Sequence, residues 1–160
     1  MVDQDIRIII DATGSFAMLG KKNLPLYAMH AVRSLQQMQF LQQAEVSVYA
    51  WQGDCVDPAS EEALMHPEGV GDIDALCESL SDGAEDGAVC LLLTDACFEQ
   101  DDWQCLQGLP EQVRWSTIVV TLGADADTEQ AEQCFPHVYA LGDLPGALQA
   151  ALLLEEKEEF

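Results

Sequence analysis

The stretch Ile6-Arg7-Ile8-Ile9-Ile10-Asp11 decides the fold of this chain. A short run of β-branched apolar residues that ends at an acid is typical of a strand buried on both faces. A turn of small residues follows at positions 12–15. The most apolar run of the chain, residues 88–93, predicts a second buried strand and is followed by Thr94 and Asp95. Strands of this kind are typical of a parallel sheet that helices cover on both faces.

Strands and helices alternate along the rest of the chain. Further strands are expected at residues 45–51, 115–121 and 137–140, the last at a sheet edge. Helices are expected at residues 26–43, 72–80, 101–109, 128–134 and 144–154, with Asn23 capping the first. Residues 52–71 indicate irregular structure with a short strand around Val56. This order predicts a three-layer, doubly wound α/β fold, Rossmann-like, with a mostly parallel sheet and one antiparallel edge strand. Residues 1–154 are expected to form one domain and residues 155–160 a charged tail.

The charge of the chain is strongly acidic. Six Lys and Arg stand against 29 Asp and Glu, which gives a formal net charge of −23. Such a field repels phosphate backbones and anionic lipid, so nucleic acid and membrane surfaces are excluded as expected partners. It favours basic protein partners and cations, and the alternative is a solvated acidic surface that binds no partner.

The cysteines and the start of the chain indicate the cellular compartment. The six cysteines form no Cys-x-x-Cys pair and no zinc-ligand spacing. Residues 1–5 lack the basic and long apolar regions of a signal peptide, and no apolar run reaches the roughly 18 residues of a membrane span. Free thiols without an export signal predict a reducing compartment, the cytoplasm.

Four motifs resemble one known family. Ile8-Ile9-Ile10-Asp11-Ala12-Thr13-Gly14-Ser15 resembles the apolar strand and Asp-x-Ser-x-Ser loop of von Willebrand factor A (vWA) domains. Leu92-Leu93-Thr94-Asp95-Ala96 is similar to the later Leu-Leu-Thr-Asp-Gly loop of that family. Gly69-Val70-Gly71-Asp72-Ile73 stands where the family has Gly-Gly-Thr-Asp-Ile, and residues 116–123 are similar to the penultimate strand and its glycine. The motifs follow the family order along essentially the whole chain.

The resemblance implies a metal-ion-dependent adhesion site. Its ligands to Mg²⁺ would be Asp11, Thr13, Ser15 and Asp95. Mg²⁺ is a hard octahedral ion that prefers oxygen ligands and keeps several waters, and an acidic side chain of a partner can complete its shell. Gly71 stands where the family has a threonine ligand. Asp72 is adjacent and could substitute for it, or could cap the following helix as in the family.

The alternative is a degenerate site that is kept for its loop geometry. Asp11 and Thr13 would then satisfy backbone groups in their turn, and Asp95 would cap a helix.

The resemblance further implies a non-catalytic module, not an enzyme, that binds a protein partner through these loops. The expected partner-binding residues are Ser15, Lys21, Lys22 and Gly71. The partner is expected to be basic or to supply an acidic metal ligand; Lys21 and Lys22 could also simply neutralise acidic neighbours. One alternative is a structural subunit of a multi-component assembly, since bacterial members of the family often work beside ATPases or kinases. The other is a Mg²⁺-dependent phosphoryl-transfer enzyme with Asp11 as nucleophile.

Overall fold

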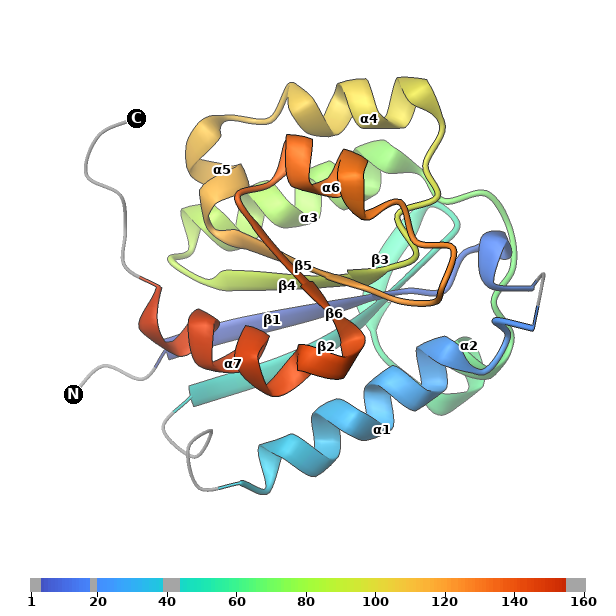
Figure 1. Ribbon diagram of the computed structural model, residues 1–160, viewed down its shortest axis with the longest axis horizontal. Helices are drawn as coiled ribbons and strands as arrows, with labels where there is room; N and C mark the ends of the chain where they lie inside the picture. The colour runs from blue at the N-terminus through green and yellow to red at the C-terminus, as the bar shows by residue number, and fades with distance from the viewer. Residues whose placement is uncertain (1–3, 18–19, 39–43, 155–160) are drawn as a thin grey trace.

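One sheet forms the centre of the computed structural model (Figure 1), which describes residues 4–17, 20–38 and 44–154 without the side chains of Ser15 and Ala17. Its strands are β1 (Gln4–Asp11), β2 (Ala44–Gln52), β3 (Cys55–Pro58), β4 (Val89–Thr94), β5 (Thr117–Thr121) and β6 (His137–Ala140). Across the sheet they lie in the order β3-β2-β1-β4-β5-β6. Neighbouring strands run parallel except β2 and β3, which are antiparallel. The predicted mostly parallel sheet with one antiparallel edge strand is therefore confirmed. The strands at its two edges, β3 and β6, have four residues each.

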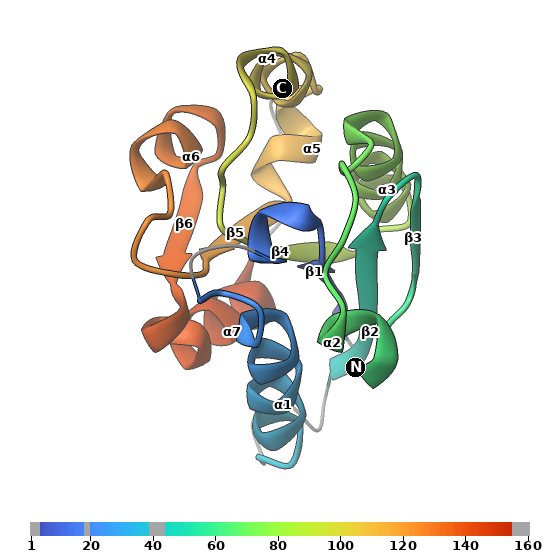
Figure 2. The same ribbon diagram turned by 90° about the vertical axis from the view of Figure 1, so that its right-hand side faces the viewer.

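Helices cover both faces of the sheet. They are α1 (Leu24–Gln36), α2 (Glu61–Met65), α3 (Ile73–Glu85), α4 (Gln100–Gln107), α5 (Glu111–Trp115), α6 (Thr128–Cys134) and α7 (Leu144–Leu153), with the 3-10 helices η1 (Gly14–Ala17) and η3 (Leu141–Asp143). Figure 2 shows α1, α2 and α7 on one face and α3, α4, α5 and α6 on the other. Among the described residues, no helix combines the length and the apolar character that a membrane crossing requires.

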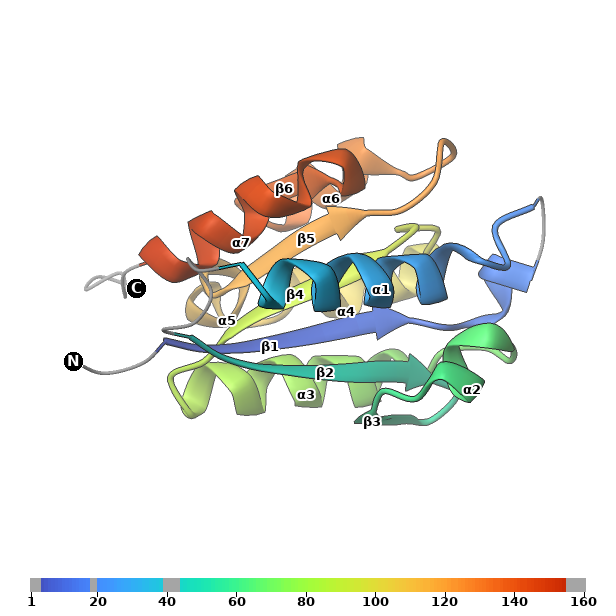
Figure 3. The same cartoon turned by 90° about the horizontal axis from the view of Figure 1, so that it is seen from below.

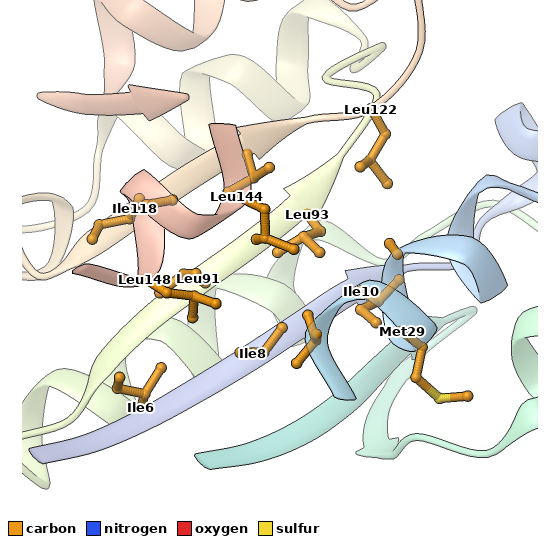
Figure 4. Close-up of a cluster of buried hydrophobic side chains, with 14 of the residues drawn as sticks. Ile6, Ile8, Ile10, Met29, Leu91, Leu93, Ile118, Leu122, Leu144 and Leu148 are labelled. Carbon is orange, nitrogen blue, oxygen red and sulfur yellow. The ribbon is translucent and has the colours of Figure 1, made fainter. Parts of the chain in front are cut away.

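The alternation of side chains along β1 produces the two halves of the core. Ile6, Ile8 and Ile10 point to one face and are fully buried in a cluster with Met29 of α1 and Leu148 of α7 (Figure 4). The residue between them, Ile9, points to the other face and packs in the cluster beneath α3 and α4. A strand with apolar side chains on both faces is stable only between two helical layers, as the sequence predicts.

Four local features differ from the expectation. The segment 52–71 contains a short helix, α2, in addition to β3, because the hydroxyl of Ser60 caps it by accepting a hydrogen bond from the N–H of Ala63 at 3.2 Å. The first helix ends at Gln36 rather than 43, where its buried face is complete; residues 39–43 lie outside the described residues. Asn23 stands at the N-cap position, but its side chain makes no capping hydrogen bond because its backbone is already helical. The sequence also does not predict α5.

The strand order creates a switch point between β1 and β4. The chain leaves β1 toward β2 on one side of the sheet, whereas β4 continues toward β5 on the other. Ligands of such sheets bind beyond the carboxyl ends of the strands at this point. Figure 3 shows the parallel strands pointing toward the same end of the molecule. We call this end the loop edge, formed by residues 11–17, 68–72, 95–99 and 122–127.

Candidate functional site

The carboxyl ends of β1 and β4 lie side by side at the loop edge. In the register of the two strands, Ile10 pairs with Leu93, which places Asp11 beside Thr94. The hydroxyl of Thr94 donates a hydrogen bond to Oδ2 of Asp11 at 2.7 Å, and both side chains are buried. The sequence does not single out Thr94 as a site residue. A hydroxyl residue between a buried strand and Asp95 is the pattern that could have found it.

Asp11 accepts hydrogen bonds on both carboxyl oxygens. Its Oδ1 accepts from the backbone N–H of Thr13 at 2.9 Å, and its Oδ2 accepts from Thr94. Burial raises the pKa of Asp11 from 3.8 to about 6; the charge of Asp95 acts in the same direction and the hydrogen bonds oppose it. Asp11 is therefore a buried acid whose oxygens are held by donors of the protein itself.

Gly71 leaves room for the indole ring of Trp51. A Cβ atom at position 71 would lie 2.5 Å from Cζ2 of Trp51 and 2.6 Å from Cγ2 of Thr13. Trp51 is 2% exposed, and its Nε1 donates a hydrogen bond to the carbonyl oxygen of Asp72 at 3.2 Å. The place where a side chain on residue 71 would begin is therefore filled by an aromatic ring and a methyl group.

Asp95 forms an ion pair with Lys21. The ammonium nitrogen of Lys21 lies 3.0 Å from Oδ2 of Asp95 and 2.9 Å from Oδ2 of Asp125. The other oxygen of Asp95, Oδ1, accepts from the N–H of Cys97 at 3.1 Å. Burial would lower the pKa of Lys21, but its contacts with Asp125 and Asp95 outweigh burial and raise the pKa overall. Lys21 thus stays charged, and it joins the loop after β4 to the loop after β5.

Ala96 has a backbone conformation that favours glycine. Its φ is 55°, in the left-handed region, and its N–H donates to the hydroxyl of Thr94 at 3.1 Å. This conformation is about 1 kcal/mol less favourable for a residue with a Cβ atom than for glycine. The vWA motif that residues 92–96 resemble has glycine at this position, the residue that this conformation favours.

A pocket of about 250 Å³ opens at the loop edge. The predicted residues that line it are Asp11, Thr13, Gly71 and Asp95. The lining residues that the sequence does not predict are Gly14, Trp51, Gly69, Val70, Cys97, Phe98, Glu99 and Asp102. The pocket therefore combines acidic side chains with an aromatic wall, in which the ring centroids of Trp51 and Phe98 lie 5.9 Å apart. An aromatic residue in the loop directly after a buried strand is the sequence pattern that could have drawn attention to Phe98.

Some of the predicted site residues lie away from this pocket. Asp72 is exposed and caps α3, its Oδ1 accepting from the N–H of Asp74 at 2.9 Å. Lys22 is exposed, and neither it nor Lys21 lines the pocket. The side chain of Ser15 lies outside the described residues. The structure thus brings Asp11, Thr13, Gly71 and Asp95 together and places Asp72 in the capping role that was the alternative for it.

In this arrangement, the oxygen atoms of the described site residues do not form a coordination shell for Mg²⁺. All four carboxyl oxygens of Asp11 and Asp95 accept hydrogen bonds from the protein, and Asp95 faces an ammonium group. A side chain at position 71 would fit only if Trp51 and Thr13 moved, so none supplies the oxygen that the family motif has there. Within the residues that the structure describes, no group of three or more His, Cys, Asp or Glu could hold a metal ion.

No protein-family model matches the chain, and no curated protein matches its sequence. Among solved structures it is similar to the manganese-loaded TRAP protein of Plasmodium vivax, with a TM-score of 0.61 and 11% identity over 94% of this chain and 74% of that chain. It is also similar to proximal thread matrix protein 1 of the mussel byssus, with a TM-score of 0.60 and 15% identity over 96% of this chain. This second match covers 48% of the mussel protein, about half of its length. Likenesses at such identities show the fold alone, an α/β arrangement that this chain shares with both proteins.

Proposed function

We propose that this chain is a non-catalytic protein-interaction module that binds a protein partner through the loop edge. The observation that carries the proposal is Val70, which is 90% exposed and lines the pocket beside Phe98. Single exposed aliphatic residues are common, but one that lines a concave site together with a half-buried aromatic residue, Phe98, is typical of a contact surface. The two glycines that flank Val70, Gly69 and Gly71, present its side chain at the rim.

The charge of the pocket favours a basic partner segment. Glu99 is exposed and Asp102 is half-buried, and both line the pocket near the aromatic ring of Phe98. A Lys or Arg side chain can pack its stem on an aromatic face while its charged end meets carboxylates. The net charge of −23 attracts such a partner over a longer range.

The same contacts support a module without catalysis. Phosphoryl transfer would use Asp11 as nucleophile and a cation to hold the phosphoryl group. Both oxygens of Asp11 are engaged with Thr94 and Thr13, and Lys21 is engaged with two aspartates. Glu99 and Asp102 would repel a phosphoryl group at the mouth of the pocket.

Two finer expectations from the sequence stay predictions. One is a partner whose acidic side chain binds through Mg²⁺, which would need the donors of the loop edge to rearrange around the ion. The other is a cytoplasmic location, supported by six cysteines that are all free in the structure.

Val70→Asp tests the proposal by placing a charge on the contact surface. We expect recovery of the partner from a lysate of the source cells to fall by about tenfold, because a carboxylate desolvated against the partner without a counter-charge costs more than about 1 kcal/mol. The measurement is a pull-down with tagged chains, quantified by mass spectrometry against the wild-type chain.

Leu153→Asp is the matched control. Leu153 is 79% exposed at the end of α7, at the opposite end of the molecule from the loop edge (Figure 1), so its replacement should leave recovery unchanged. Equal recovery with both variants would contradict binding through the loop edge and would favour the structural-subunit alternative. Circular dichroism of both variants verifies that the fold is intact.

A further inference from the structure

The ammonium group of Lys21 is buried at the loop edge between two carboxylates. Lys21 is 7% exposed, and its Nζ lies 3.0 Å from Oδ2 of Asp95 and 2.9 Å from Oδ2 of Asp125. A buried ammonium destabilises a fold strongly unless it is paired with good geometry. Here the pairing is with acids on two different loops, one after β4 and one after β5.

The surroundings of Lys21 are shaped to hold its side chain. The ring of Phe16 in η1 is fully buried, and its centroid lies 5.6 Å from Nζ of Lys21, within range of a cation–π contact. Gly123, with φ +90°, lies against the stem of the lysine: a Cβ there would be 3.4 Å from Cδ of Lys21 and 3.2 Å from Oδ1 of Asp125. An aromatic ring, a glycine with a left-handed backbone and two carboxylates therefore enclose one ammonium group.

The carboxylate that Lys21 pairs with is the one that the vWA resemblance assigns to a metal ion. Asp95 accepts a hydrogen bond from the ammonium group of Lys21 on Oδ2 and another from the N–H of Cys97 on Oδ1. The carboxyl oxygens of Asp11 accept hydrogen bonds from the hydroxyl of Thr94 and the N–H of Thr13. The loop edge thus contains a positive charge that the chain itself supplies to one of the carboxylates that the motif assigns to an external cation.

We infer that Lys21 is the resident cation of this loop edge, and that the loops after β4 and β5 are held together by its ammonium group without a divalent ion. The filled space at Gly71 supports the inference independently, because Trp51 and Thr13 occupy the place where a threonine side chain at position 71 would begin. The inference concerns how the loop edge is built and does not depend on whether that edge binds a protein.

Thermal unfolding of wild type, Lys21→Met and Lys22→Met in EDTA and in millimolar Mn²⁺ tests this inference. We expect the Tm of the wild type to be the same in both solutions. Lys21→Met should lower Tm in EDTA by about 10 °C, because it leaves two carboxylates at the loop edge without their cation. Lys22→Met, the matched control at an exposed position, should change Tm by less than about 2 °C.

Two results would overturn the inference. The first is an unchanged Tm for Lys21→Met. The second is a Mn²⁺ ion bound to the wild type, seen by electron paramagnetic resonance, that is lost in Asp95→Asn. Mn²⁺ that remains bound in Asp95→Asn belongs to other acids of the surface and agrees with the inference.

The Mn²⁺ measurement on the wild type decides the question even if Lys21→Met does not fold. Asp125→Asn provides a milder variant, because Asp125 is exposed and its loss leaves Asp95 as the remaining partner of Lys21. Its Tm should fall by less than that of Lys21→Met, equally in EDTA and in Mn²⁺. A Tm that recovers in Mn²⁺ would show that a divalent ion can take this position in the nearly native site, and would count against the inference.

Discussion

Gly71→Thr is expected to lower the free energy of unfolding by about 3 kcal/mol, because the new side chain has no space. Its Cβ would lie 2.5 Å from Cζ2 of Trp51 and 2.6 Å from Cγ2 of Thr13, distances at which atoms must move. The substitution introduces the residue that the vWA motif has at this position, so a functional metal shell would be expected to gain from it. Urea unfolding followed by circular dichroism measures the change.

Gly142→Thr is the matched control for this substitution. A Cβ at position 142 meets nothing within 4 Å, so the same added atoms should change stability by less than about 0.5 kcal/mol. In a Trp51→Leu background the cost of Gly71→Thr should shrink, because residues in contact do not act additively. Equal losses of stability at positions 71 and 142, or stabilisation of Gly71→Thr by Mg²⁺, would contradict the claim that Trp51 and Thr13 fill the space beside Gly71.

The second large effect is a pH dependence caused by Asp11. Because burial raises its pKa from 3.8 to about 6, the folded state holds this proton over a pH range in which the unfolded chain has lost it. The proton on Asp11 therefore contributes its full stabilisation of the folded state below about pH 4, and this contribution is lost as the pH rises through about 6. The fall amounts to about 2–3 kcal/mol, from 1.36 kcal/mol per pH unit.

Asp11→Asn should remove this fall, since an amide does not ionise. The measurement is a set of urea unfolding curves in EDTA from about pH 4 to about pH 7, compared between wild type and variant. Asp54→Asn, at an exposed position, is the control and should retain the wild-type slope. Parallel profiles of wild type and Asp11→Asn would show that Asp11 is not the group responsible.

Much of the fold could be predicted because its determinants are local. The β-branched run at residues 6–10 and the apolar run at residues 88–93 each specify a strand buried on both faces, and buried strands require helices on each side. From this the convergence of Asp11 and Asp95 follows, because parallel strands end at the same edge of a sheet. Short elements such as α2 and α5 depend on single caps and tertiary packing, and so they are harder to predict.

The content of the site could not be predicted in the same way, because it depends on contacts between distant residues. Lys21 and Asp125 are 104 positions apart in the sequence, and no periodicity connects them. Trp51 ends a strand pattern in which an aromatic residue is ordinary, and only the tertiary structure shows that its ring occupies the space beside Gly71. The sequence could indicate that a ligand is missing at position 71, but not which group fills its place.

The short strands at the two sides of the sheet have a consequence for assembly. An exposed strand with free N–H and C=O groups can pair with a strand of another chain, which leads to strand exchange or aggregation. In β3 the last residue is Pro58, which has no N–H to donate, and exposed Asp57 precedes it; β6 follows directly after Pro136. The short strands β3 and β6 therefore offer few backbone groups to an incoming strand, although β3 covers β2 only from Tyr49 to Gln52. We expect β3 and β6 to resist cross-β association, and a partner at these strands to be recognised by side chains rather than by backbone pairing.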